Sequence, residues 1–235
     1  MINTYKVADH IFSVDSIFDY VHEYLKDYRS ELTPSFVIKI EKQDILNELQ
    51  FNNNDKTLSP AWYEASAVYR KLMNKITKDG YLLFHGSCIA IDRKIGVLFA
   101  GISGAGKSTH ASLYKKYLLD RCNYINDDKP ILKIDDDSVI AYGTPWSGKS
   151  NLNTDEKIEL KAIVFINKAK ENHIEPLLAS DALPNIFKQS YIPNNLVKEC
   201  MEMLSNLIKN VKCYNLYCDI SKEAFETSYR EIEKL

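Results

Sequence analysis

The stretch GISGAGKS, residues 101–108, constrains the fold of this chain more than any other feature. It matches the phosphate-binding pattern G-x-x-x-x-G-K-[ST], which functions only where a strand leads into the loop and a helix leads out of it. The run GVLFA, residues 96–100, predicts such a strand, and HASLYKKYLL, residues 110–119, has the apolar spacing of a helix. The sequence therefore predicts a strand–loop–helix unit whose backbone N–H groups surround a phosphate.

The residues of this loop have separate expected roles. Its three glycines allow the backbone conformations and the close approach that a phosphate requires. Lys107 is expected to reach the β- and γ-phosphates, and Ser108 is expected to place its hydroxyl on Mg²⁺. The residues expected to bind the nucleotide are Gly101, Ser103, Gly104, Ala105, Gly106, Lys107, Ser108 and Thr109.

A second stretch, GTPWSGKS at residues 143–150, satisfies the same pattern by letter. Pro145 removes an N–H group that a phosphate cradle would use, and the residues after Ser150 turn quickly into a predicted strand. We therefore expect no second nucleotide cradle here. Two interpretations remain open: Trp146 and Lys149 lie on the acceptor side of the site, or the segment is a rigid turn that packs under the first loop.

An acidic pair follows the next predicted strand. In CNYINDD, residues 122–128, Asp127 and Asp128 stand at the carboxyl end of an apolar run. An Asp in this place holds Mg²⁺ in proteins with this type of phosphate loop. The acids of Asp135–Asp137, by contrast, lie between two β-rich runs and are expected to form a solvated hairpin turn.

The choice of nucleotide rests on a third short motif. Asn167-Lys168-Ala169-Lys170 follows a predicted strand, as the guanine-binding motif N-K-x-D would, but it ends in lysine. The carboxylate that would accept a hydrogen bond from the guanine amino group is therefore missing. We expect ATP as the nucleotide.

Composition excludes several other classes of protein. The formal net charge of −2 argues against a general nucleic-acid binder. No run of about 18 apolar residues predicts a membrane-spanning helix, and the N-terminal residues lack the pattern of a signal peptide. The five cysteines form no metal-ligand pattern, and their odd number indicates reduced thiols. We expect a cytoplasmic protein that binds neither nucleic acid nor a membrane.

Strands and helices alternate along the chain, which predicts an α/β fold, and two adjacent β-rich runs around residues 135–137 add a hairpin that makes the sheet mixed. Helices are expected near residues 15–28 and 60–79. We expect two domains, a small N-terminal α+β subdomain over residues 1–79 and a domain with the phosphate loop over residues 80–235.

Four stretches, taken together, resemble a known family. They are LLFHGSCIAID (82–92), GVLFAGISGAGKSTH (96–110), NYINDDKPIL (123–132) and YGTPWSGKSNL (142–152). They are similar to the kinase domain of bacterial HPr kinase/phosphorylase and, more closely, to the small HPr-kinase-like proteins of ribosomal peptide pathways, such as lasso-peptide kinases. Many of the latter are described as phosphoenolpyruvate carboxykinase-like because they share that P-loop fold. The resemblance covers about residues 81–192 and implies a P-loop kinase core like the C-terminal domain of HPr kinase, with a mixed sheet.

The resemblance also implies roles for individual residues. Asp128 would be the general base for the acceptor hydroxyl, and Asp127 would hold Mg²⁺ with Ser108. The opposite assignment of the two acids remains open. His85 would lie near the transferred phosphate, or it is a histidine that only makes a hydrogen bond at a strand edge. Together with Lys107, these are the expected catalytic residues.

The chain also departs from the family pattern. Thr109-His110 follow the loop serine where HPr kinase usually has Glu, and the later signature loop with its glutamate and arginine is not recognisable. Both differences weigh against a phosphorylase half-reaction and against HPr as the substrate. We expect an ATP- and Mg²⁺-dependent kinase that acts on a hydroxyl, that of a serine in a peptide or protein. A kinase for a small hydroxylated metabolite and a non-catalytic ATP-binding regulatory module are the alternatives, and a homo-oligomer remains open.

Overall fold

The computed structural model describes residues 2–235 and divides into two compact units. The first unit ends at Ile76, and the second runs from Thr77 to Leu235. The sequence places the boundary between residues 79 and 80, slightly later in the chain. The short 3₁₀ helix Thr77–Asp79, which directly continues the last helix of the first unit, accounts for the difference because helical spacing carries on through it.

The first unit packs helices against a three-stranded sheet in the order β1-β2-β3. Strands β1 and β2 are antiparallel, whereas β2 and β3 are parallel. Buried apolar side chains from both the strands and the longest helix, among them Phe12 and Leu72, form its core. The elements are β1 (Ile2–Val7), β2 (His10–Asp15), α1 (Tyr20–Tyr24), β3 (Phe36–Lys39), α2 (Lys42–Phe51) and α3 (Pro60–Ile76).

The helix predicted near residues 15–28 is much shorter in the structure. Strand β2 extends to Asp15, and α1 begins only at Tyr20. The segment between them does not enter the helix because the buried carboxylate of Glu64 accepts hydrogen bonds from the backbone N–H groups of Ile17 and Phe18. This partner comes from α3, far along the chain, so local spacing could not indicate it.

The second unit is built on a ten-stranded sheet in the order β12-β4-β8-β9-β10-β6-β5-β7, and β13 pairs with both β10 and β11. Strand β10 runs parallel to β6 and β13, whereas β8 and β9 form the predicted antiparallel hairpin. The predicted α/β class with a mixed sheet is confirmed. The strands are β4 (Tyr81–Phe84), β5 (Ser87–Ile91), β6 (Ile95–Ala100), β7 (Cys122–Asn126), β8 (Ile131–Ile134), β9 (Val139–Tyr142), β10 (Lys157–Lys168), β11 (His173–Pro176), β12 (Ser190–Tyr191) and β13 (Lys212–Cys218).

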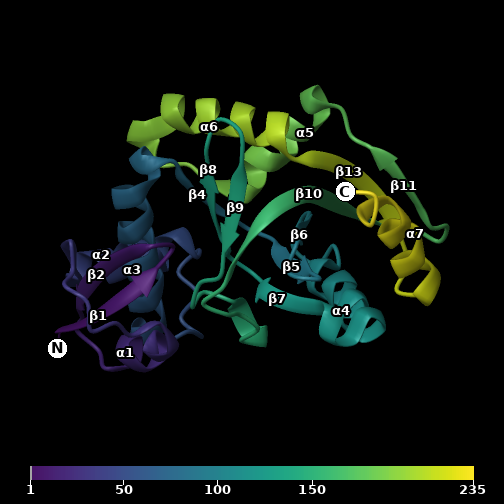
Figure 1. The fold of residues 1–235 in the computed structure, drawn as a ribbon. Coiled ribbons are helices and arrows are strands. Elements are labelled where there is room, and N and C mark those ends of the chain that lie inside the picture. The colour runs from purple at the N-terminus through teal and green to yellow at the C-terminus, as the bar shows by residue number, and fades with distance from the viewer. Residues whose placement is uncertain (1) are drawn as a thin grey trace. The chain divides into compact units, whose positions relative to one another are not determined.

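Helices cover both faces of this sheet, with α5 and α6 on one face and α4 and α7 on the other (Figure 1). The strand period of two sends alternate side chains to opposite faces. Leu98 of β6 joins the core under α5 and α6, and its neighbour Phe99 joins the core under α4 and α7. The helices are α4 (Lys107–Leu118), α5 (Ala179–Gln189), α6 (Val197–Asn210) and α7 (Lys222–Ile232).

This arrangement brings four strand ends to one edge of the sheet. Strands β6, β10 and β13 are parallel, and β7 runs in the same direction as β6 because both are antiparallel to β5. Their carboxyl ends therefore meet at the same edge, where ligands of open α/β sheets bind. In residues 2–235, the helices lack the length and apolar composition needed to cross a membrane.

Candidate active site

The phosphate-binding pattern at residues 101–108 adopts the predicted context, since it follows the buried strand β6 and opens helix α4. Gly104 and Gly106 have φ values of 76° and 109°, which side chains on L-residues rarely adopt. A Cβ added to Gly104 would meet no atom within 4 Å, so the loop leaves open space at this position. The backbone thus forms a turn that can approach an anion closely.

The start of α4 provides N–H groups for such an anion. The first intrahelical bond of this turn joins the N–H of His110 to the carbonyl of Gly106 at 2.8 Å, so the N–H groups before it have no partner within the helix. Ser108 and Thr109 are exposed in the same turn. The partial positive charge of the helix N-terminus adds to these N–H groups, and together they favour a bound phosphate.

The ammonium group of Lys107 lies within the phosphate loop. Its side chain is buried, and Nζ donates hydrogen bonds to the carbonyls of Gly101 at 3.0 Å and Ile102 at 3.3 Å. Burial lowers the pKa of Lys107, and the nearby carboxylates of Asp128 and Asp127 act in the opposite direction. The ammonium group therefore lies in the field of both acids.

Asp127 is fixed in place at the end of β7. Its side chain is buried, and Oδ1 accepts a hydrogen bond of 2.6 Å from the hydroxyl of Ser87 on β5. Its backbone N–H donates to the carbonyl of Leu152 at 3.0 Å. The first contact orients the carboxylate and the second fixes the backbone that carries it, as a metal ligand requires.

Asp128 is more accessible, with 21% of its side chain exposed. His85 Nε2 lies 3.3 Å from one carboxylate oxygen, and the ammonium group of Lys129 contacts the other. Burial acts to raise the pKa of Asp128, but the hydrogen bond from His85 and the charge of Lys129 outweigh it and hold the pKa below its ordinary value. The carboxylate is consequently ionised at neutral pH and can accept a proton.

His85 stands between β4 and β5, with 42% of its side chain exposed. Its backbone N–H donates to the carbonyl of Gln189 at 2.7 Å, which ties the turn to the end of α5. The imidazole contacts Asp128 and so lies beside the acidic pair. This position fits a histidine near the transferred phosphate, and it equally fits a histidine that only makes a hydrogen bond, so both interpretations stay open.

Residues 143–150, the second match to the pattern, pack against the acidic pair. The hydroxyl of Thr144 donates to the carbonyl of Lys129 at 2.8 Å, and Asn126 Nδ2 donates to the carbonyl of Thr144 at 2.9 Å. A Cβ added to Gly148 would lie 3.1 Å from Cβ of Asp128 and 3.2 Å from its Cγ. The segment therefore forms one wall beside Asp128.

The second match opens no α-helix, as expected, because Gly148–Ser150 form only a short 3₁₀ turn. Trp146 is buried, with 5% of its surface exposed, whereas Lys149 is exposed. Burial makes Trp146 a packing residue of this wall, and its predicted place on the acceptor side stays a prediction, as does that of Lys149.

Sequence reasoning missed several residues that shape the site, chiefly Ser87, Lys129 and Asn126. The side-chain oxygen of Asn126 accepts hydrogen bonds from the N–H groups of Asp128 at 2.9 Å and Lys129 at 2.6 Å. Asn at the end of a strand often forms such a turn, so the run Asn-Asp-Asp contained a signal for it. No comparable pattern marked Ser87, since its partner Asp127 is 40 residues away along the chain.

The residues present fit a magnesium ion that is shared with a nucleotide. Among the described residues, no group of three or more His, Cys, Asp or Glu side chains could hold a metal by itself. Mg²⁺ commonly takes one or two protein ligands and completes its shell with phosphate oxygens and waters. The oriented carboxylate of Asp127 and the exposed hydroxyl of Ser108 match that requirement.

Comparison with known proteins gives little further information. No protein-family model matches the chain, and no curated protein matches it. Among solved structures, the HPr(Ser) kinase/phosphatase from Coxiella burnetii is similar, with 12% sequence identity over 65% of this chain and 99% of that chain and a TM-score of 0.36. The basis for a functional assignment is therefore the strand order and the site residues of this chain.

Proposed function

We propose that the protein is an ATP- and Mg²⁺-dependent kinase that transfers the γ-phosphoryl group to a hydroxyl, that of a serine in a peptide or protein. One observation carries the proposal: the phosphate loop with Lys107 and the acidic pair Asp127–Asp128 follow strands that run in the same direction and end at the same sheet edge. Phosphoryl transfer depends mainly on positioning and charge neutralisation, and this edge supplies groups for both.

Ser108 and Asp127 would hold Mg²⁺, which neutralises charge on the phosphates when it is bound. Lys107 adds a second positive charge at the loop, and its contacts with the loop carbonyls keep the ammonium directed there. The N–H groups at the start of α4 complete the binding of the phosphates.

Asp128 is the proposed general base. The acceptor oxygen forms a bond to the γ-phosphorus, the bond from that phosphorus to the β-phosphate oxygen breaks, and the hydroxyl proton passes to the Asp128 carboxylate. His85 and Lys129 hold this carboxylate in its ionised form before transfer. The exposure of Asp128, compared with the burial of Asp127, favours this assignment of the two acids.

Phosphoryl transfer to a set of acceptors tests this proposal. The protein is incubated with Mg²⁺ and ATP carrying a γ-phosphate label, together with serine-containing peptides, the same peptides with alanine in place of serine, and small polyols. We expect label on serine peptides only. Asp128→Asn should lower the rate at least ~100-fold, in line with typical general-base contributions, while ATP still binds.

Asp127→Asn is the matched comparison and should instead raise the Mg²⁺ concentration that half-maximal activity requires. Label on polyols alone would replace the peptide acceptor with a small metabolite. A protein that binds ATP but labels no hydroxyl acceptor would be a regulatory module, which contradicts the proposed kinase function.

A further inference from the structure

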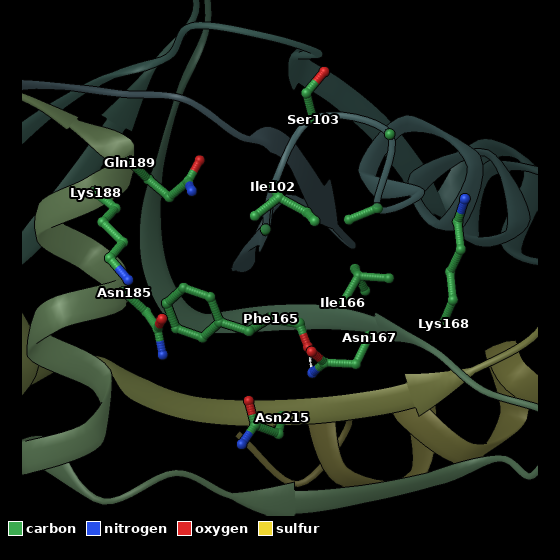
Figure 2. A pocket seen from close by; sticks show the side chains of 13 residues that line it. Ile102, Ser103, Phe165, Ile166, Asn167, Lys168, Asn185, Lys188, Gln189 and Asn215 are labelled. Atoms are coloured by element: carbon green, nitrogen blue, oxygen red, sulfur yellow. Dashed lines mark hydrogen bonds between the residues drawn. The ribbon is translucent and has the colours of Figure 1, made fainter.

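The phosphate loop is supported unequally on its two sides. On one side, residues 101–105 border a cavity of about 520 Å³, which α5 and the ends of β10 and β13 complete (Figure 2). The side chain of Ile102 is 77% exposed, and a Cβ added to Gly104 would project into open space. Because packing on this side does little to fix the loop, its geometry depends on helix α4, which the loop opens.

The first turn of α4 is anchored in the protein interior by the side chain of His110. The imidazole is buried, with 2% exposure, and packs edge-on against Phe99 with the ring centroids 5.0 Å apart. Its Nε2 lies 2.9 Å from Oγ of Ser228, a buried residue of α7 that is 118 positions further along the chain. The backbone N–H of the same histidine closes the first helical bond, to Gly106. One residue therefore connects the start of α4 to the C-terminal helix.

The hydrogen bonds around Ser228 determine which ring nitrogen of His110 carries the proton. The Ser228 hydroxyl donates to the carbonyl of Phe225 at 3.1 Å and accepts from the hydroxyl of Tyr114 at 2.9 Å. A serine hydroxyl has one proton and two lone pairs, so it meets the imidazole as an acceptor and Nε2 donates. Nδ1 is then the acceptor that faces the thiol of Cys218 at 4.0 Å. Burial lowers the pKa of His110 to about 4, so the ring is neutral at neutral pH and keeps these roles.

Helix α7 is a firm support for this contact. The rings of Phe225 and Tyr229 stack with centroids 5.3 Å apart, and Tyr114 of α4 meets Phe225 edge-on at 5.0 Å. Hydrogen bonds weaken steeply when donor and acceptor are misaligned, so a tilt of the first turn of α4 would misdirect the N–H groups of residues 107–109. The orientation of these N–H groups is thus linked to a contact on the far side of the helix.

We propose that His110 is a positioning residue, which holds the first turn of α4 in its phosphate-binding orientation by donating a hydrogen bond to Ser228 of α7. The proposal rests on the proposed kinase function, because it requires that the loop binds phosphate. It adds the C-terminal helix to the groups on which phosphate binding depends, although neither residue has a side chain at the phosphate loop itself.

The test uses Mg-tripolyphosphate as the probe, since it carries phosphates and nothing else. Calorimetry measures its binding to the full chain and to three variants, each checked for folding by circular dichroism. His110→Leu removes the donor but leaves Ser228 bonded to Tyr114 and Phe225. His110→Gln keeps a side-chain N–H that can donate to Ser228. Ser228→Ala removes the acceptor from the α7 side and tests the same contact if His110→Leu does not fold.

His22→Leu is the matched control. His22 is also a buried histidine, and its ring nitrogens make hydrogen bonds to the Tyr5 hydroxyl at 2.7 Å and to the Ser16 hydroxyl at 2.8 Å. It belongs to the first unit, away from the phosphate loop in the chain. This variant therefore loses a comparable buried contact without changing the support of α4.

We expect His110→Leu and Ser228→Ala each to weaken tripolyphosphate binding at least about fivefold, the low end of typical couplings between separate sites. The double variant should lose no more than the larger single loss, because both changes remove the same contact. His110→Gln should recover most of the affinity, and His22→Leu should bind as the unmodified protein does.

Unchanged affinity in either folded variant of the contact, or a loss in His110→Gln as large as that in His110→Leu, would overturn the positioning role. An equal loss in His22→Leu would also overturn it, because any buried histidine would then have the same effect. An unmodified protein that does not bind tripolyphosphate would instead contradict the proposed kinase function, so the two failures are distinguishable.

Discussion

At the scale of single residues, two adjacent aspartates differ in what their surroundings allow them to do. Asp127 is buried and accepts a hydrogen bond from Ser87, whereas Asp128 is partly exposed and contacts His85 and Lys129. Both residues follow the end of β7, in a turn where the side-chain oxygen of Asn126 accepts hydrogen bonds from the N–H groups of Asp128 and Lys129. This difference in exposure supports our proposal that Asp128 is the base and Asp127 the metal ligand.

The pKa of Asp128 leads to a prediction about pH. Burial alone would raise this pKa, and the hydrogen bond from His85 is the largest influence that lowers it. His85→Ala removes that influence, so the pKa rises and the acid limb of the kcat/KM profile should move to higher pH. Because a lowered pKa stabilises the fold above the unfolded-state pKa of Asp and loses this effect in acid, the variant should also be less stable near neutral pH.

His173→Ala is the control for this experiment, because His173 lies on β11 and stacks on Tyr217. Its pH profile should coincide with that of the unmodified protein. A profile of His85→Ala that does not move, or that moves to lower pH, would show that His85 does not tune the base.

At the scale of elements, short-range sequence patterns predicted individual strands, helices and turns. The strand–loop–helix unit, the β8–β9 hairpin and the long strand β10 all follow from apolar spacing and turn residues within a few positions of each other. The structure adds α2 and the edge strand β11, which sequence reasoning did not identify. In α2 the spacing signal is weak, and its start is fixed by a hydrogen bond of 2.7 Å from the Glu41 N–H to the Asp44 carboxylate.

The candidate site also has parts that local sequence predicts and parts that it does not. The phosphate loop and the acidic pair are recognisable because each is a local motif at a strand end. The wall that residues 143–150 form against Asp128 could not be predicted, because it depends on contacts between Asn126, Lys129 and Thr144 that only the folded sheet brings together. The cavity beside the loop is likewise assembled from four separate elements.

Gly148 tests the importance of this wall. Its φ of 68° costs a non-glycine residue about 1–2 kcal/mol, and an added Cβ would press on Asp128 at 3.1 Å. We expect Gly148→Ala to slow phosphoryl transfer as well as to destabilise the protein. Gly80→Ala is the control: Gly80 has a similar φ of 88°, but the nearest atom to its added Cβ is the flexible end of Lys133 at 2.8 Å.

Urea unfolding and the transfer rate, measured on both glycine variants, separate the loss of stability from the loss of activity. The variants should lose similar stability, and only Gly148→Ala should lose rate beyond its loss of folded protein. Equal rates for the two variants at equal folded fraction would mean that the wall does not position Asp128.

At the scale of the whole molecule, every proposed catalytic and binding residue belongs to the second unit, from Thr77 to Leu235. Two apolar cores, one on each face of its sheet, hold the strands whose ends carry these residues. The edge of the sheet therefore presents three regions in order: a cavity at the end of β10, the phosphate loop at β6 and the acidic pair at β7. This order places the phosphate loop and the acidic pair, the two parts on which the proposed kinase function depends, at one edge of the sheet.

The central claim is that this edge transfers a phosphoryl group with Lys107 at the phosphate loop. Its most direct test is the rate at which γ-labelled phosphate reaches a hydroxyl acceptor, measured for the full chain and for Lys107→Ala after circular dichroism shows that both are folded. We expect transfer by the unmodified protein and no detectable turnover by Lys107→Ala. Unchanged transfer by a folded Lys107→Ala variant would contradict it.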